Sequence, residues 1–268
     1  MGQDGALAAL NPAAGASTWM MLAVVGAKGG CGTSLLAANL AAELAATRSV
    51  CLVDLQFSKG DLAGCLNLAP THCVRDVLGP DVRLDAAAVR GSVEAHSSGL
   101  DVLTQPYDLV DLIRVDAGEV DRLLGVTSQA WSVVVADCGS GIEEALLTAM
   151  RRATFVLLVV TPTIPALRDA VRTLGLLKDL GVPQSRVRLA LNRWQSGLSL
   201  DQADIEEQLA MTSFVTFAED LHACVAAEER GALLSEAAPR SRLTRDVRAA
   251  ATRVLAELDQ LAPSLRSL

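Results

Sequence analysis

The chain has 268 residues, of which 51% are apolar and 20% are charged. This composition suits a globular protein with a sizeable core, and it excludes both a disordered chain and a small fold held together by disulfides. The formal net charge of −8 and the 3% aromatic content argue against a protein that binds nucleic acid over its whole surface or by base stacking.

Residues 1–18 are mostly small and show no periodicity, so we expect a flexible leader there and a single domain over residues 19–268. The apolar run over residues 19–27 is about half the roughly 20 residues that a membrane-spanning helix needs. Six cysteines occur without a CxxC pair, which is typical of buried thiols in a reducing compartment. We therefore expect a cytoplasmic protein.

Short apolar runs alternate with longer helical patterns along the rest of the chain. In chain order we expect strand 20–26, helix 34–46, strands 50–55 and 100–104, helix 120–129, strand 131–137, helix 141–152, strand 154–161, helix 164–180, strand 187–192, helix 200–210, strand 214–217 and helix 244–261. Most of these strands are continuous Val, Leu and Ala runs, which indicates burial on both faces. The pattern predicts an α/β fold: a doubly wound, mostly parallel sheet with helices on both faces and ligands at the carboxyl ends of its strands.

The clearest functional signal is the segment Gly-Ala-Lys-Gly-Gly-Cys-Gly-Thr-Ser at residues 26–34, which follows the first strand and opens the first helix. Its glycines let successive backbone amides converge, and the helix N-terminus adds positive potential, so the segment is suited to nucleotide phosphates. The Ser34 hydroxyl is placed to ligate Mg²⁺. We expect the cofactor to be held here by Lys28, Gly29, Gly30, Cys31, Gly32, Thr33 and Ser34.

This segment resembles the deviant Walker A motif of the MinD/ParA family of P-loop ATPases, K-G-G-x-G-K-[ST]. Lys28 matches the signature lysine of that family, which the resemblance implies reaches across a sandwich dimer to the nucleotide of the partner. Thr33 stands where the ordinary P-loop lysine would be. The other matching positions are Gly29, Gly30, Gly32 and Ser34. The resemblance implies ATP and Mg²⁺ as cofactors, a P-loop NTPase fold and an ATP-sandwich homodimer.

Two further strands end in a carboxylate. Asp137 closes a Val-Val-Val-Ala run, and it is interpreted as a Walker B-like group that holds Mg²⁺ together with Ser34, although a helix cap is the alternative for this pattern alone. Asp54 closes the second strand and resembles the first Asp of the family's V-D-x-D switch. Gln56 stands at the second Asp position, which the family links to the attacking water, and glutamine orients water in some GTPases. We name Lys28, Asp54 and Gln56 as catalytic candidates.

Asn192 and Arg193 follow the strand at residues 187–192 and resemble the family's base-recognising Asn-Arg pair, so we assign both to the cofactor site. An ordinary strand-end turn is the alternative. Losing the P-loop lysine at Thr33 removes an interaction of about 4 kcal/mol, taken at 4 Å and an effective dielectric near 20. With Gln56 in the switch, we expect weak, slow or absent turnover of ATP to ADP and phosphate.

The missing P-loop lysine, the Gly-Asp-Leu-Ala segment at 60–63 and the stretch at 70–72 most resemble the TadZ/CpaE branch of this family. That resemblance implies a nucleotide-dependent switch that positions or assembles a Tad-type pilus or secretion apparatus and docks on its protein components. Members of the branch usually carry an N-terminal receiver-like domain, which we do not expect in the short stretch before Met20. A polar location, or one at the inner face of the membrane, would agree with this role.

Two other roles remain as alternatives. A ParA-type partitioning ATPase would bind DNA through a local basic patch, whereas a solvated helix face is the simpler interpretation. The arginines of that patch are Arg240, Arg242, Arg245, Arg248 and Arg253. A MinD-like membrane cycler would use the last helix, whose apolar stripe is more typical of docking on a core. That stripe comprises Val247, Ala251, Val254, Leu258 and Leu261.

Overall fold

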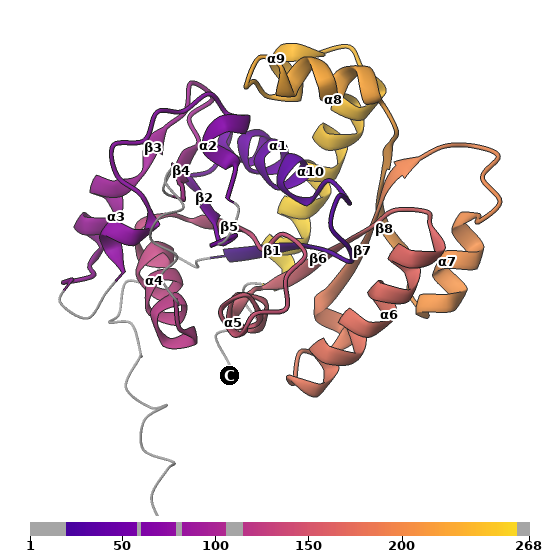
Figure 1. Ribbon diagram of the computed structural model, residues 1–268, viewed down its shortest axis with the longest axis horizontal. Coiled ribbons are helices and arrows are strands. Elements are labelled where there is room, and N and C mark those ends of the chain that lie inside the picture. The colour runs from indigo at the N-terminus through magenta and orange to yellow at the C-terminus, as the bar shows by residue number, and fades with distance from the viewer. Residues whose placement is uncertain (1–19, 58–59, 79–81, 106–114, 262–268) are drawn as a thin grey trace, which may run out of the picture.

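The computed structural model describes residues 20–57, 60–78, 82–105 and 115–261, so the predicted leader at 1–18 lies outside the described residues. One eight-stranded sheet runs through the molecule in the order β3-β4-β2-β5-β1-β6-β7-β8 (Figure 1). Every neighbouring pair is parallel except β3 with β4. The strands are β1 (Met20–Gly26), β2 (Val50–Asp54), β3 (Glu94–Ala95), β4 (Asp101–Leu103), β5 (Val133–Asp137), β6 (Phe155–Val160), β7 (Val187–Trp194) and β8 (Ser213–Ala218).

Helices cover both faces of the sheet, which confirms the predicted doubly wound α/β class. In Figure 1, α1 and α10 lie together on one face, and α4, α5 and α6 lie on the other. The helices are α1 (Thr33–Ala45), α2 (Leu62–Cys65), α3 (Ala86–Ser92), α4 (Ala117–Ala130), α5 (Glu144–Arg152), α6 (Ile164–Asp179), α7 (Gln202–Leu209), α8 (Leu221–Glu228), α9 (Leu234–Ala237) and α10 (Arg242–Leu261). Short 3₁₀ turns occur at Val74–Val77 and Gln184–Arg186.

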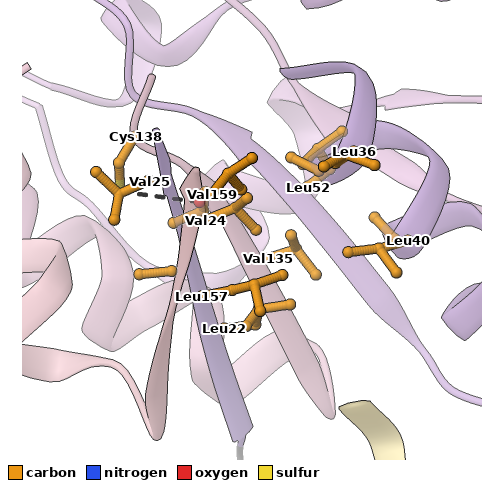
Figure 2. Packing of buried hydrophobic residues seen from close by; sticks show 14 of the residues in the cluster. Leu22, Val24, Val25, Leu36, Leu40, Leu52, Val135, Cys138, Leu157 and Val159 are labelled. Atoms are coloured by element: carbon orange, nitrogen blue, oxygen red, sulfur yellow. Dashed lines mark hydrogen bonds between the residues drawn. The ribbon is translucent and has the colours of Figure 1, made fainter. Parts of the chain in front are cut away.

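The core lies between these layers. All residues of the central strands β1, β2, β5 and β6 are buried, as expected where helices pack on both faces. Figure 2 shows Leu36 and Leu40 of α1 packed over the aliphatic side chains of the central strands. Each fully buried Leu or Val contributes about 1.5–3 kcal/mol, so these layers fix the position of the loops at the strand ends.

Most predicted elements are present, but several of their bounds differ from the prediction. Helix α4 begins at Ala117, not at residue 120, because Asp116 caps it. The Asp116 carboxylate accepts a hydrogen bond from the Glu119 backbone N–H at 2.8 Å, and the Glu119 carboxylate accepts one from the Asp116 backbone N–H at 3.0 Å. The helix expected from residue 141 begins at Glu144. Strand β7 continues to Trp194, beyond the predicted end at 192.

The sequence interpretation missed β3, α2, α3, α8 and α9. These elements are short, with α2 and α9 of four residues each and β3 of two, so they present too few positions for a helical or strand period to be recognised. In the described parts of the chain, no helix combines the length and apolar character that crossing a membrane requires.

The apolar stripe of the last helix faces the core of the protein. Val247, Ala251, Val254 and Leu258 are buried, and Leu261 packs against the same core. Helix α10 packs on α1 and reaches β8. The stripe therefore docks on the protein itself in this fold and is not open to a membrane surface.

Candidate functional site

The loop after β1 turns sharply between two layers of the fold. Gly30 and Gly32 adopt φ values of +81° and +83°, which L-residues with side chains rarely adopt. The loop is fixed at its start because the Gly26 amide donates to the Gly139 carbonyl at 2.7 Å. At its end, Gly32 precedes α1 and offers no side-chain cap, so the first amides of α1 are left for a ligand.

This loop forms one wall of a cavity of about 420 Å³, a size that suits a nucleotide-scale ligand. The predicted site residues that line it are Lys28, Gly29, Gly30, Gly32, Thr33, Ser34, Gln56 and Arg193. Lys28 is exposed, so its ammonium is free to reach toward a ligand or a partner molecule. The structure thus brings together most of the residues assigned from the sequence.

Ser34 lines this cavity, and the fully buried Asp137 is linked to it through Gln56. The Gln56 side-chain amide donates to Ser34 Oγ at 2.8 Å and to Asp137 Oδ2 at 2.9 Å, so one nitrogen atom bridges the two oxygens. A hydroxyl and a carboxylate that converge on one point form a donor set that suits Mg²⁺, which takes its remaining ligands from phosphate and water. The residues present therefore fit the predicted cation.

Asp54 and Asp137 lie opposite each other on neighbouring strands, as register partners in the β2–β5 pair. Both carboxylates are fully buried. Burial raises the pKa of Asp54 well above its ordinary value, and the nearby Asp137 raises it further. Burial also raises the pKa of Asp137, although hydrogen bonds from Ser34, Gly139 and Gln56 lower it in part. The pair is costly to ionise, and a bound cation would offset that cost.

Polar contacts hold the segment after β2 in place. The Gln56 amide N–H donates to Asp54 Oδ1 at 2.9 Å, and the Gln105 side chain donates to the Asp54 carbonyl at 2.6 Å. Gly60 makes room, because a Cβ there would lie 2.5 Å from Asp54 Oδ2. Gln105 was missed from the sequence: a polar residue directly after the strand at 100–104 is the signal that could have identified it.

Asn192 and Arg193 lie differently with respect to the cavity. Arg193 lines it with φ +56°, whereas Asn192 is only 5% exposed. The Asn192 side chain donates to the Cys31 carbonyl at 2.7 Å, beneath the glycine loop. Cys31 is itself buried. Base reading by Asn192 stays a prediction, and in this structure its amide supports the loop.

The remaining wall of the cavity comes from a region that the sequence interpretation left empty. Ala227 and Glu228 of α8, with Ala232 after it, also line the cavity. Asn39 of α1 ties this region to the loop's own helix, because its side chain accepts the Leu234 amide at 2.8 Å. A buried Asn within the apolar helix 34–46 is the signal that could have pointed to this contact.

Thr33 lies at the start of α1 and is 7% exposed. A Cβ on Gly26 would lie 2.3 Å from Thr33 Oγ1, so the threonine hydroxyl packs against the end of β1. The position that holds lysine in an ordinary P-loop therefore presents a short side chain directed back toward the sheet.

The arginines of the predicted basic patch are exposed, and two of them have partners within the chain. Arg248 Nε lies 3.3 Å from Glu43 Oε1, and the Arg253 guanidinium sits 4.5 Å from the centroid of the Phe214 ring. These contacts lie on α10 and not at the cavity.

No family model matches the chain. Among curated proteins, it is 25% identical to the septum site-determining protein MinD of Thermotoga maritima over 199 residues, which cover 71% of this chain and 72% of the relative. It is 29% identical to the chloroplastic MinD homologue of Arabidopsis thaliana over 224 residues, with 78% of this chain and 67% of the relative covered.

Solved structures give the same picture for the fold. A ParA family ATPase from Chlorobium tepidum matches with a TM-score of 0.81 at 24% identity, over 87% of this chain and 98% of that one. MinD from Pyrococcus horikoshii, solved with Mg-ADP, matches with a TM-score of 0.76 at 20% identity over 88% and 97%. MinD of Aquifex aeolicus in a MinC:MinD complex gives 0.75 at 22% over 88% and 96%.

The chain is thus similar in sequence to MinD proteins, and it shares the fold of the solved MinD and ParA structures. Within a MinD/ParA-like frame, the glycine loop, Ser34 and Asp137 occupy the carboxyl ends of β1 and β5, where open α/β sheets bind their ligands.

Proposed function

We propose that this chain is a MinD/ParA-type ATPase: it binds ATP with Mg²⁺, forms a homodimer around the nucleotides, and acts as a switch that positions a cellular machine. The observation that carries the proposal is the convergence of Ser34 and Asp137 on one point beside an open helix N-terminus. A phosphate chain and a divalent cation need these two features side by side.

Each group has a role that follows from its chemistry. The amides of the glycine loop and the first turn of α1 bind phosphate oxygens, and the Lys28 ammonium adds a mobile positive charge from the rim. Ser34 and Asp137 hold Mg²⁺, which neutralises phosphate charge when it is bound. Arg193, Ala227 and Glu228 surround the part of the cavity that remains for the nucleoside.

We further propose that hydrolysis is slow or absent. Gln56 places an uncharged amide where the resembled switch carries a second carboxylate. Thr33 supplies no charge to the phosphates. A protein with these two features would hold ATP for long periods, which suits a positional switch better than a metabolic enzyme.

The machine to be positioned is a finer proposal. The features that resemble the TadZ/CpaE branch favour a Tad-type pilus or secretion apparatus, reached through protein partners in the cytoplasm or at the inner face of the membrane. The Aquifex MinD relative was solved in complex with the cell division protein MinC, so protein docking has a precedent on this fold. Co-purification of this chain with pilus components, compared with and without ATP, would test this docking.

The proposed function is tested by size-exclusion chromatography and calorimetry of the full chain with and without ATP and Mg²⁺. We expect the wild type to bind ATP and to shift to a dimer, and Lys28→Ala to lose the shift. Lys178→Ala is the matched control, because Lys178 is an exposed lysine of α6 outside the cavity. A well-folded wild type that binds no adenine or guanine nucleotide would refute the proposal.

A further inference from the structure

The Gln56 side chain makes contacts in the site that its sequence context does not predict. Its Nε2 atom lies within hydrogen-bond distance of Ser34 Oγ and Asp137 Oδ2, at 2.8 and 2.9 Å. A primary amide carries two N–H donors and no charge, so these two contacts use its whole donor capacity. The same two oxygens are the protein's own candidate ligands for the cation. An uncharged side chain thus sits where a divalent ion would be coordinated.

The placement of Gln56 is supported from two directions. Its backbone N–H donates to Asp54 Oδ1 at 2.9 Å, which holds the main chain just after the end of β2. Gly139, with φ +55°, provides the space: a Cβ at that position would lie 2.6 Å from both Cδ and Oε1 of Gln56. A glycine at 139 is therefore needed for the glutamine to reach the two oxygens.

The amide and a metal ion cannot share this position. Mg²⁺ binds oxygen ligands at about 2.0–2.1 Å, so an ion held by Ser34 and Asp137 would overlap the nitrogen that now bridges them. We propose that the Gln56 side chain is a latch that fills the cation position in the metal-free protein and that Mg²⁺ must displace it. This inference rests on the proposed nucleotide function and adds a mechanism of regulation to the same site.

One consequence follows from the exchange. Metal binding must break two hydrogen bonds, each of modest net strength, so the latch should weaken metal affinity by about tenfold.

The test measures metal affinity directly. The full chain with saturating ADP is titrated with Mn²⁺, and the electron paramagnetic resonance signal of the free ion measures how much Mn²⁺ remains unbound. We expect Gln56→Ala to bind Mn²⁺ about tenfold more tightly than the wild type, because its side chain cannot compete for the two oxygens. Gln184→Ala is the matched control: the Gln184 amide bonds the Ala210 carbonyl at 3.1 Å, before the start of β7, and should leave Mn²⁺ affinity unchanged.

A second variant guards against loss of folding. Gln56→Met keeps the length of the side chain but has no donor, so it should reproduce the tighter Mn²⁺ binding. Unchanged or weaker Mn²⁺ binding in folded Gln56→Ala and Gln56→Met would overturn the latch while leaving nucleotide binding intact. Failure of the wild type to bind ADP with or without metal would instead refute the proposed function, and the latch with it.

Discussion

The side-chain amide of Asn192 donates to the backbone carbonyl of Cys31 at 2.7 Å, and so joins the end region of β7 to the glycine loop after β1. The contact is buried and close: a Cβ on Gly32 would lie 2.5 Å from Asn192 Nδ2. A residue whose sequence context suggests base recognition therefore also shapes the phosphate loop.

Asn192→Ala is expected to weaken ATP and GTP binding by similar factors and to lower the free energy of unfolding by about 1–2 kcal/mol. The physical reason is that a buried carbonyl loses its donor and the loop loses a support. Calorimetric titration with both nucleotides and urea denaturation measure the two effects. A change confined to the preference for adenine over guanine would contradict this expectation and would favour direct base reading.

Asp137→Asn is expected to remove most of the Mg²⁺ dependence of nucleotide binding. The substitution keeps the shape of the side chain but removes the negative charge that a cation needs at the end of β5. We expect ADP affinity in the presence of Mg²⁺ to fall by about tenfold or more, toward the value measured with EDTA. Asp169→Asn is the control, since Asp169 pairs with exposed Arg172 on α6. Equal Mg²⁺ dependence in the Asp137 variant and the wild type would exclude this metal position.

The buried pair of Asp54 and Asp137 predicts a pH dependence of stability in metal-free buffer. Because the folded-state pKa of Asp54 is raised, the folded state holds the proton more tightly than the unfolded state. This contribution to stability is full below the ordinary Asp pKa of about 3.9, and it is lost as the pH rises toward the raised folded value. Asp54→Asn removes the titration, so its stability relative to the wild type should increase with pH.

The measurement is urea denaturation with EDTA at several values between about pH 5 and pH 8. The difference between Asp54→Asn and the wild type should grow over this window, and Asp169→Asn should show no such trend. A constant difference would mean that Asp54 does not titrate there. Added Mg²⁺ with ADP should reduce the trend, because the positive charge of a cation at Asp137 offsets the negative charge that raises the pKa of Asp54.

The sequence predicted the fold well where the chain is long and apolar. The central strands are continuous buried runs. Their carboxyl ends lie at the same edge of the sheet, however the outer strands are arranged. The positions of Ser34, Asp54 and Asp137 therefore followed from the strand pattern. Prediction was poorest for short pieces. The segment 221–237 forms α8 and α9 and provides a wall of the cavity, yet it carries too little periodicity to be recognised.

Side-chain contacts across the site could not be predicted from the sequence. Gln56, Ser34 and Asp137 come from three different strand ends, and only the three-dimensional register shows that one amide bridges the other two side chains. The support of the loop by Asn192 likewise depends on how far β7 extends beside its neighbours β6 and β8. Patterns of residue types can identify the residues of the site, whereas the packing of the fold determines which of them are in contact.

The basic residues of α10 are expected to serve stability more than DNA binding. The exposed Arg253 guanidinium stacks on the buried Phe214 ring, so Arg253→Ala should lower the free energy of unfolding by about 0.5–1 kcal/mol. DNA binding should be weak in both proteins and should vanish as the salt concentration rises. Fluorescence anisotropy with a DNA duplex over a range of ionic strength measures this. Tight DNA binding that Arg253→Ala and Arg245→Ala abolish would favour the partitioning role instead.

ATP turnover at saturating ATP and Mg²⁺ is expected to lie far below the range of about 1–100 per second that is typical of kinases. Position 56 carries an uncharged amide in place of the second carboxylate of the resembled switch, and Thr33 is a short side chain packed against Gly26, so neither adds charge at the attacking water or the leaving phosphate. Phosphate release by the purified chain measures the rate, with Lys28→Ala as the background. A turnover of several per second that disappears in Lys28→Ala would show that Lys28 and the loop amides suffice for fast hydrolysis.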